Sequence, residues 1–401
     1  MSNSQSWIKR GLTHVAKTYG RYPLVAASGE GCWLTDIDGK KYLDFLAGVA
    51  VNNLGHCHPE VVAALQDQAG KLLHCSNFFH IPQQIELAEI LCEHSFGDRV
   101  FFCNSGAEAN EAALKLVRKY SLDNHGDDRI EIITGKNSFH GRTIATISAT
   151  DQEKISTGFG PLLPGFKYVP FGDIEAIKAT ISSKTCAIML EPIQGEGGIN
   201  IPPEGYLQAV RELCDQNGLL LIFDEVQVGL GRTGKLFAYQ HDGVEPDVMT
   251  LAKALAAGPP IGAMVVREKY ATALGPGTHG STFGGNPLLA AAGVAAMKIY
   301  LKGSVLKNSV TMGDYLKAKL EQLQTKYTFI TQVRGRGLMV GMELTIEGGE
   351  IVKTALERGL LINCTAGKIL RFVPPLIVTQ QEIDQMIEIL DKIFSEIRTG
   401  E

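Results

Sequence analysis

The chain contains 401 residues, 45% of them hydrophobic and 20% charged, which is the composition of an ordinary globular protein with a large core. Its 38 lysines and arginines are outnumbered by 43 aspartates and glutamates, and the net charge of −5 argues against nucleic acid or an anionic membrane as the main partner. No apolar run reaches the roughly 18 residues that a membrane-spanning helix needs.

The first 60 residues show no long helical pattern. Residues 1–29 contain no acidic side chain and four basic ones, which predicts a short basic arm and resembles an organelle transit peptide only weakly. Two short strands are predicted at 31–36 and 41–45, on either side of a tight turn. The following patterns predict helices over about 60–72 and 82–95.

From residue 99 onward, short apolar strands alternate with helical patterns. This alternation indicates βαβ units and a mostly parallel sheet. The predicted strands lie at residues 100–103, 130–134, 187–190, 219–223, 248–251 and 262–266. Helices are predicted after the turn at 104–110 and over about 287–301.

After residue 301 the elements become more mixed. The patterns predict a helix at 309–325, one alternating strand at 335–344, a helix at 349–358, strands at 360–363 and 370–373, and an amphipathic helix at 380–397. This mixture indicates a smaller α+β domain beside a large α/β domain. We therefore predict an N-terminal segment over 1–60 that joins the small domain, a large domain over 61–303, and a C-terminal small domain over 304–401.

The eight cysteines are scattered, with no C-x-x-C pair among them. In a chain of this length, that distribution predicts free thiols in a reducing compartment rather than a disulfide framework. Together with the weak transit signal, it favours a cytoplasmic protein.

Two short motifs are not taken as sites. Gly229-x-Gly231-x-x-Gly234 matches the dinucleotide fingerprint, but no clear helix follows it and no acid closes a second strand at the right distance. His56-Cys57-His58 offers too few ligands for a tetrahedral metal site, so a structural loop is favoured there and no metal is expected.

Two apolar runs end abruptly at charged residues. Residues 219–223 end on Asp224, and residues 248–252 end on Lys253. Because parallel strands deliver such side chains to the carboxyl edge of the sheet, where ligands bind, we expect an acid and an amine at one rim. A lysine of lowered pKa forms Schiff bases with aldehydes, and an aspartate can keep a pyridine nitrogen protonated. A buried structural Asp–Lys ion pair is the alternative that the spacing leaves open.

Ser105-Gly106-Ala107 lies between a predicted strand and a helix. A small turn at a helix N-terminus exposes backbone N–H groups and the positive end of the helix dipole, which suits a phosphate. Taken alone, it is equally consistent with an ordinary N-cap. Beside the acid and the amine, a phosphate site would complete the requirements of pyridoxal phosphate (PLP).

Longer motifs resemble the class III aminotransferases, which are fold type I enzymes that use PLP. The similarity runs in order over residues 18–398 and is carried by Asn104–Asn110, Phe139–Thr143, Glu191–Gly198, Phe223–Gly234, Leu251–Leu255 and Gly280–Pro287. Within the family, Gly48–Pro59, Leu360–Thr365 and Arg371–Leu376 are most similar to the acetylornithine branch. One departure lies after Lys253, where the family usually carries a glycine pair and an aromatic residue. The chain has Ala256-Ala257-Gly258-Pro259-Pro260 instead, which we expect to narrow the loop beside the cofactor.

The resemblance implies transfer of the terminal amino group of N2-acetyl-L-ornithine to 2-oxoglutarate, a step of arginine biosynthesis. Transaminases for ornithine, succinylornithine, succinyldiaminopimelate or 4-aminobutyrate share the same central residues and stay open as alternatives. A non-catalytic small-molecule-binding protein is the alternative of a different class.

The resemblance also implies which residues hold the cofactor. Lys253 would bond to it, Asp224 would contact the ring nitrogen, and Phe139 would stack on the ring. Gln227 would lie near the ring's 3-oxygen. The remaining implied cofactor residues are Ser105, Gly106 and Ala107 at the phosphate, Glu225 and Val226, and Thr282, which would reach the phosphate from the partner subunit of a homodimer.

For the substrates, the resemblance implies two arginines, whose planar forks suit carboxylates. Arg371 would bind the α-carboxylate of glutamate or 2-oxoglutarate, and Arg142 would bind the far carboxylate, which is the α-carboxylate of acetylornithine. Glu196 would pair with Arg371 while acetylornithine is bound, because an unpaired charge in a closing site is costly. Ser281 and Tyr22 would line the substrate end.

Overall fold

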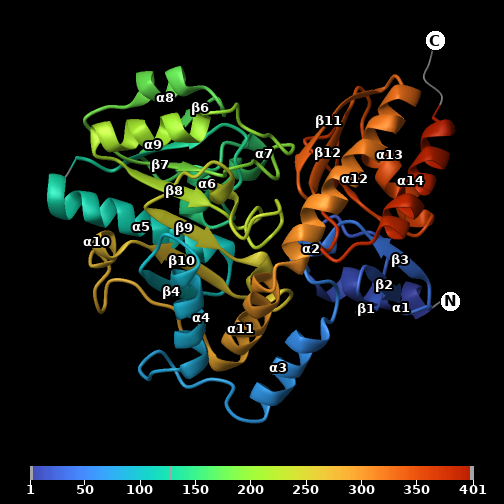
Figure 1. The fold of residues 1–401 in the computed structure, drawn as a ribbon, viewed down its shortest axis with the longest axis horizontal. Helices are drawn as coiled ribbons and strands as arrows, with labels where there is room; N and C mark the ends of the chain where they lie inside the picture. The colour runs from blue at the N-terminus through green and yellow to red at the C-terminus, as the bar shows by residue number, and fades with distance from the viewer. Residues whose placement is uncertain (1–2, 127, 398–401) are drawn as a thin grey trace.

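The fold is described from a computed structural model, which places residues 3–126 and 128–397. Its largest element is a seven-stranded sheet in the order β4-β10-β9-β8-β7-β5-β6 (Figure 1). The strands are β4 (Arg99–Cys103), β5 (Glu131–Gly135), β6 (Phe166–Val169), β7 (Thr185–Leu190), β8 (Leu220–Asp224), β9 (Val248–Leu251) and β10 (Gly262–Val266). All neighbours run parallel except β10, which is antiparallel to both β4 and β9. The predicted α/β class with a mostly parallel sheet is therefore confirmed.

Helices cover both faces of this sheet, which explains why its central strands are continuous apolar runs. On β7, Ala187 and Met189 face the cluster that contains α5 (Gly106–His125), while Ile188 and Leu190 face the cluster that contains α9 (Tyr206–Asn217). The remaining helices of this part are α3 (Pro59–Ala69), α4 (Pro82–Glu93), α6 (Ile144–Ala149), α7 (Glu153–Ser156), α8 (Ile174–Thr180), α10 (Glu268–Ala271), α11 (Pro287–Leu301) and the 3-10 turns η1 (Ala238–His241) and η2 (Lys253–Ala256).

Two four-stranded sheets form the other part of the molecule, on the right in Figure 1. One has the order β1 (Ala26–Glu30), β2 (Trp33–Asp36), β3 (Lys41–Asp44), β13 (Leu360–Leu361), and the other β11 (Ile330–Arg336), β12 (Met339–Leu344), β15 (Ile369–Phe372), β14 (Asn363–Thr365). The helices here are α1 (Asn3–His14), α2 (Ala47–Ala50), α12 (Ser304–Lys326), α13 (Gly349–Glu357) and α14 (Gln380–Ser395). Because β13 pairs with β3, strands from both ends of the chain share one sheet. The proposed domain limits at 60/61 and 303/304 stay a prediction.

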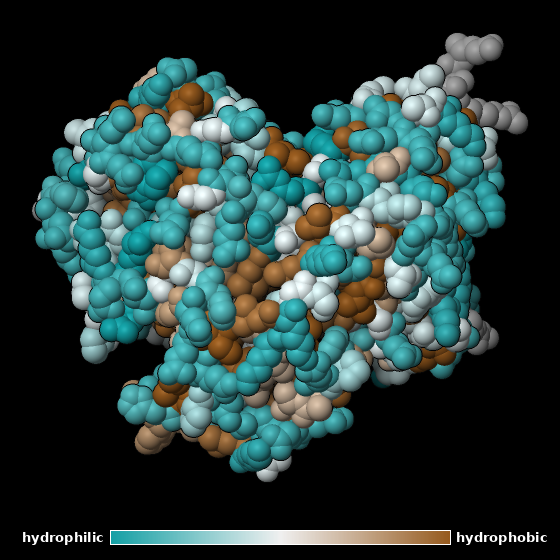
Figure 2. All heavy atoms as spheres, viewed as in Figure 1, coloured by the Kyte–Doolittle hydropathy of each residue, from teal (hydrophilic) through white to brown (hydrophobic). Residues whose placement is uncertain are grey.

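The molecular surface shows the same two parts, one with the large sheet and one with the two smaller sheets. Figure 2 shows a notch at the upper edge between the part that carries α8 and α9 and the part that carries α12 to α14. Among the described residues, no single helix is long and apolar enough to cross a membrane, and only α11 and α12 together, across a 65° bend, pass a test of length and composition.

Three local predictions are wrong. The first 60 residues do contain a long helix, α1, which buries none of its side chains although Ile8 and Leu12 stand at the i, i+4 spacing of a helix face. The single strand predicted at 335–344 is the end of β11 and the whole of β12, joined by a turn at residues 337–338. The helix predicted at 309–325 begins earlier, at Ser304.

Candidate active site

A cavity of about 410 Å³ lies at the carboxyl edge of the large sheet. Asp224, the last residue of β8, and Lys253, two residues beyond the end of β9, both line it. The prediction that the two strands deliver an acid and an amine to one rim is therefore confirmed. Ser105, Gly106 and Ala107, at the start of α5, line the same cavity.

Asp224 is buried and held by three donors. Asn110 Nδ2 donates to its Oδ2 at 2.8 Å, the Val226 N–H donates to its Oδ1 at 3.0 Å, and His140 Nδ1 lies 2.8 Å from Oδ2. Because a carboxylate only accepts hydrogen bonds, His140 Nδ1 carries the proton of that contact. Thr250 Oγ1 in turn donates to Asn110 Oδ1 at 2.7 Å. The network fixes the orientation of the carboxylate at the cavity.

Lys253 begins η2 with a left-handed backbone, φ +43°. Burial lowers the pKa of its amine to about 8; the Glu196 carboxylate opposes that shift and the Arg371 guanidinium adds to it. Among the described residues, no ion pair or hydrogen bond joins Lys253 to Asp224, which excludes the structural ion pair that the spacing had left open. A buried lysine with a lowered pKa is partly neutral near pH 7 and therefore nucleophilic.

The turn before α5 serves as a helix cap and leaves room for a ligand. Ser105 Oγ accepts a hydrogen bond from the Glu108 N–H at 3.2 Å, so the N-cap interpretation is correct. A Cβ added at Gly106 would lie 2.8 Å from a methyl carbon of Val226, which shows how closely the turn approaches the strand-end loop. The N-terminus of the 20-residue helix α5 thus faces the cavity with its free N–H groups, as a phosphate requires.

A second loop brings an aromatic ring and a cation to the cavity. Phe139 and Arg142 both line it, and the Arg142 guanidinium carbon lies 5.7 Å from the centre of the Phe139 ring. Glu191, which the sequence did not single out, holds this loop: its Oε1 accepts from the Phe139 N–H at 3.0 Å and its Oε2 from the Gly195 N–H at 3.0 Å. Burial raises the pKa of Glu191 to about 7.

Arg371 and Glu196 form the pair that the sequence predicts. Arg371, on β15, is 1% exposed, and its Nη1 donates to Glu196 Oε1 at 2.5 Å and to Gln227 Oε1 at 3.0 Å. Its Nε donates to Asn363 Oδ1 at 3.2 Å. Burial alone would raise the pKa of Glu196, but the adjacent Arg371 guanidinium lowers it below its ordinary value. The pair adjoins the cavity through Gln227, which lines it.

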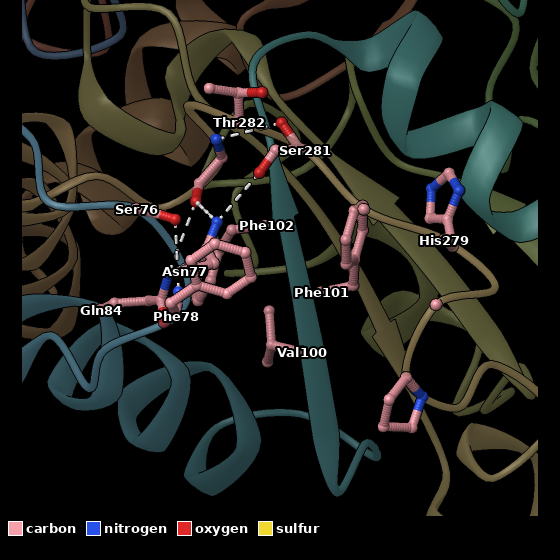
Figure 3. Close-up of a pocket in the computed structure, with 14 residues that line it drawn as sticks. Ser76, Asn77, Phe78, Gln84, Val100, Phe101, Phe102, His279, Ser281 and Thr282 are labelled. Atoms are coloured by element: carbon pink, nitrogen blue, oxygen red, sulfur yellow. Dashed lines mark hydrogen bonds between the residues drawn. The ribbon is translucent and has the colours of Figure 1, made fainter.

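Six predicted residues lie outside the lining of this cavity: Arg371 and Glu196, which adjoin it, and Glu225, Ser281, Thr282 and Tyr22. Glu225 turns the other way, because its two oxygens accept hydrogen bonds from the Ala238 and Tyr239 N–H groups at 2.6 and 2.7 Å. Ser281 and Thr282 line a separate cavity of about 700 Å³ (Figure 3). Tyr22 lines a third, of about 410 Å³.

The loop after Lys253, whose sequence differs from the usual family pattern, lies at the cavity. Gly258, Pro259 and Pro260 line the cavity, and Ala257 is held in a left-handed conformation, φ +52°. Whether this loop narrows the space beside a cofactor stays a prediction.

Three buried polar residues of the site, Asn110, His140 and Glu191, were not assigned roles from the sequence. The first two stand inside the quoted motifs and Glu191 opens one, but their partners are distant in the chain: His140 and Asn110 contact Asp224 across 84 and 114 positions. The only feature of the sequence that could have pointed to these residues is that they belong to the family motifs.

The residues present fit PLP. One cavity holds a buried amine, an oriented carboxylate, an aromatic ring and a helix N-terminus, which are the partners of its aldehyde, ring nitrogen, ring face and phosphate. Gly106 leaves open a cradle that a larger residue would fill.

Comparison with known proteins agrees with this assignment. A family model described as aminotransferase class-III matches residues 14–394. The chain is 54% identical to the acetylornithine aminotransferase of Methanocaldococcus jannaschii, with 99% of this chain and 100% of that one covered. It is 55% identical to the acetylornithine aminotransferase of Caldanaerobacter subterraneus subsp. tengcongensis, with 96% and 98% covered. A solved ornithine aminotransferase from Toxoplasma gondii, whose active site is partly occupied by PLP, is 37% identical with a TM-score of 0.94, covering 98% and 94% of the two chains.

Proposed function

The chain belongs to the class-III aminotransferase family, and we propose that it moves the terminal amino group of N2-acetyl-L-ornithine to 2-oxoglutarate. The products are N-acetyl-L-glutamate 5-semialdehyde and L-glutamate, and the step belongs to arginine biosynthesis. The full-length similarity to acetylornithine aminotransferases supports this donor. The solved ornithine aminotransferase makes ornithine the main competing donor.

One observation carries the chemistry: a buried lysine and an oriented aspartate share a cavity that an arginine–glutamate pair adjoins. PLP, the cofactor of this family, supplies an electron sink for the charge that develops on the substrate carbon. Lys253 would hold its aldehyde carbon, Asp224 its ring nitrogen and Phe139 its ring face. Ser105, Gly106 and Ala107 would hold its phosphate.

Lys253 would serve as the general base. In its neutral form, Nζ can take the proton from the substrate carbon that bears the amine, which suits a lysine whose pKa is lowered to about 8. Asp224 would face the ring nitrogen, and Asn110 and His140 hold its carboxylate in place through hydrogen bonds to Oδ2. The buried walls around them exclude water from the reacting carbon.

Arg371 and Glu196 would let one site accept two unlike substrates. Glutamate carries a carboxylate beside its amine, and this carboxylate would replace Glu196 as the partner of Arg371. Acetylornithine has none at that position, and Glu196 would then stay paired with the buried guanidinium, which avoids an unpaired charge. Arg142, exposed at the mouth of the cavity, would bind the carboxylate at the far end of either substrate.

We further propose a homodimer in which Thr282 completes the phosphate site of the partner subunit. Large apolar side chains are exposed here: Phe78, which lines the cavity of Thr282 and Ser281, is 92% exposed, and Phe283, which follows Thr282 in the chain, is 59% exposed. An apolar patch of this kind is typical of a protein interface. The eight cysteines are free thiols, which supports a cytoplasmic location.

The test is a panel of half-reactions, in which each amine donor is mixed with the PLP-loaded protein and the cofactor's absorbance change is followed. The donors compared are N2-acetylornithine, ornithine, succinylornithine, succinyldiaminopimelate and 4-aminobutyrate, and N2-acetylornithine should give the highest kcat/KM of the five. A higher value for another donor would replace the proposed substrate. If no donor changes the cofactor's absorbance, and Lys253→Ala leaves the spectrum unaltered, the protein would be a non-catalytic binder of small molecules.

A further inference from the structure

The loop before α11 lies directly on the edge of the large sheet. It contains Ser281 and Thr282, and it packs against β4, one of the two edge strands of that sheet. A Cβ added at Gly284 would lie 2.1 Å from the Phe102 carbonyl oxygen, so only glycine allows this approach. The loop is therefore packed tightly against β4 at Gly284, while the Thr282 side chain is exposed.

Two amide side chains hold the loop on both sides of Thr282 (Figure 3). Asn77 Nδ2 donates to the carbonyl oxygens of Ser281 and Gly284, each at 3.0 Å. Gln84 Nε2 donates to Asn77 Oδ1 at 2.8 Å and to the Gly285 carbonyl oxygen at 3.1 Å. We call Asn77 and Gln84 the amide clamp.

The clamp comes from a different part of the chain than the loop. Asn77 stands in the exposed segment between α3 and α4, and Gln84 stands in the first turn of α4, about 200 positions before the carbonyl groups that they bind. An exposed loop without such donors would sample many backbone conformations, and fixing one of them costs conformational entropy. A side-chain amide is suited to this task because it donates and accepts at once.

The same loop is also tied to its own subunit's site. Asn104 lines the PLP cavity, and its Nδ2 donates to Ser281 Oγ at 3.2 Å. An effect of the clamp could therefore reach the phosphate turn of its own subunit through Asn104, or the partner's site through Thr282.

We infer that Asn77 and Gln84 are positioning residues that hold Thr282 in the conformation in which it completes the partner subunit's phosphate site. The inference rests on the proposed function, in which Thr282 acts across the dimer. It assigns the clamp a role in trans: damage to the clamp of one subunit impairs the site of the other.

Isosteric variants test the donors without removing volume. Asn77→Asp keeps the acceptor for Gln84 but replaces the Nδ2 donor of two hydrogen bonds by an oxygen. Loss of these two hydrogen bonds, one exposed and one part-buried, predicts about tenfold weaker PLP binding to the apo-dimer, measured by absorbance titration. Asn124→Asp is the matched control, because Asn124 Nδ2 donates to a carbonyl oxygen on the exposed face of α5, and its PLP affinity should be unchanged.

Hybrid dimers of two differently tagged chains separate action in trans from action in cis. A reference hybrid of a Lys253→Ala chain with a Thr282→Ala chain should retain about half of the wild-type kcat, since one of its two sites is complete if Thr282 acts in trans. If this hybrid is inactive, the proposed role of Thr282 fails, and the clamp inference fails with it.

With the reference hybrid active, two further hybrids decide about the clamp. When Asn77→Asp and Lys253→Ala are on different chains, the working site receives Thr282 from an intact clamp, and its KM and PLP affinity should be those of the wild type. When both substitutions are on one chain, the working site receives Thr282 from the damaged clamp and should bind PLP about tenfold more weakly.

Equal PLP affinities in these two hybrids would overturn the inference while leaving the proposed function intact. An unchanged affinity in the Asn77→Asp homodimer would also overturn it. If Asn77→Asp does not assemble, Gln84→Glu removes the other donor of the clamp and takes its place in the same hybrids, with assembly checked by light scattering.

Discussion

Replacing Glu196 by alanine should change the preference between the two substrates rather than activity as a whole. The substitution removes the carboxylate that accepts from Arg371 Nη1 at 2.5 Å and leaves the guanidinium, 1% exposed, with Gln227 and Asn363 as neutral partners. Glutamate brings its own carboxylate to Arg371, but acetylornithine brings none there. The variant should therefore lose transition-state stabilisation mainly with acetylornithine.

The magnitude follows from the geometry of the pair. A hydrogen bond to a charged group contributes about 1.5–3 kcal/mol, and the Glu196 side chain is 29% exposed, so solvent screening favours the lower part of that range. A loss of about 1.5–2 kcal/mol corresponds to a fall of roughly 10- to 30-fold in kcat/KM for acetylornithine relative to glutamate.

The assay is the single-turnover half-reaction of each donor, followed by the absorbance change of the cofactor. Glu196→Gln keeps a neutral acceptor and should give a smaller change in the ratio. Glu343→Ala is the matched control, because it removes the carboxylate partner of Arg334, an arginine–glutamate pair outside the cavity, and it should leave the ratio unchanged. Equal losses for both donors in Glu196→Ala would refute the switching role.

Three further outcomes follow from the buried polar groups. Because burial lowers the pKa of Lys253 to about 8, and only the neutral amine attacks an aldehyde, the rate at which PLP bonds to the apoenzyme should rise with pH and level off above about 8; a stopped-flow rate independent of pH would contradict this. Asn110→Ala removes a donor to Asp224 and should lower kcat about tenfold; an unchanged kcat would show that the network does not orient the carboxylate. Arg232→Met should destabilise the fold by roughly 3–4 kcal/mol in denaturant unfolding, because it deprives the buried carbonyl oxygens of Leu338 and Pro374 of their donor; a loss below about 1 kcal/mol would contradict this.

Elements with a strong pattern could be predicted, and elements without one could not. The central strands β7 to β10 are buried at every residue, so they stand out as continuous apolar runs with charged ends. The strand β6 has only one fully buried residue and leaves little pattern to recognise, whereas α1 carries apolar residues at helical spacing and was missed. The turn between β11 and β12 was missed although Gly337, which has a left-handed φ of +57°, marks it.

The sequence by itself determined the chemical groups of the site: an amine and a carboxylate at the ends of two buried strands, a small turn before a helix, and motifs that carry the arginines. Only the tertiary structure decided how these groups meet. Asp224 and Glu225 are chemically alike and adjacent, yet one lines the cavity and the other is bound by the N–H groups of Ala238 and Tyr239. The reason is that successive side chains along an extended chain point to opposite faces. Asp224 therefore faces the cavity, and the next residue, Glu225, faces the interior of the protein.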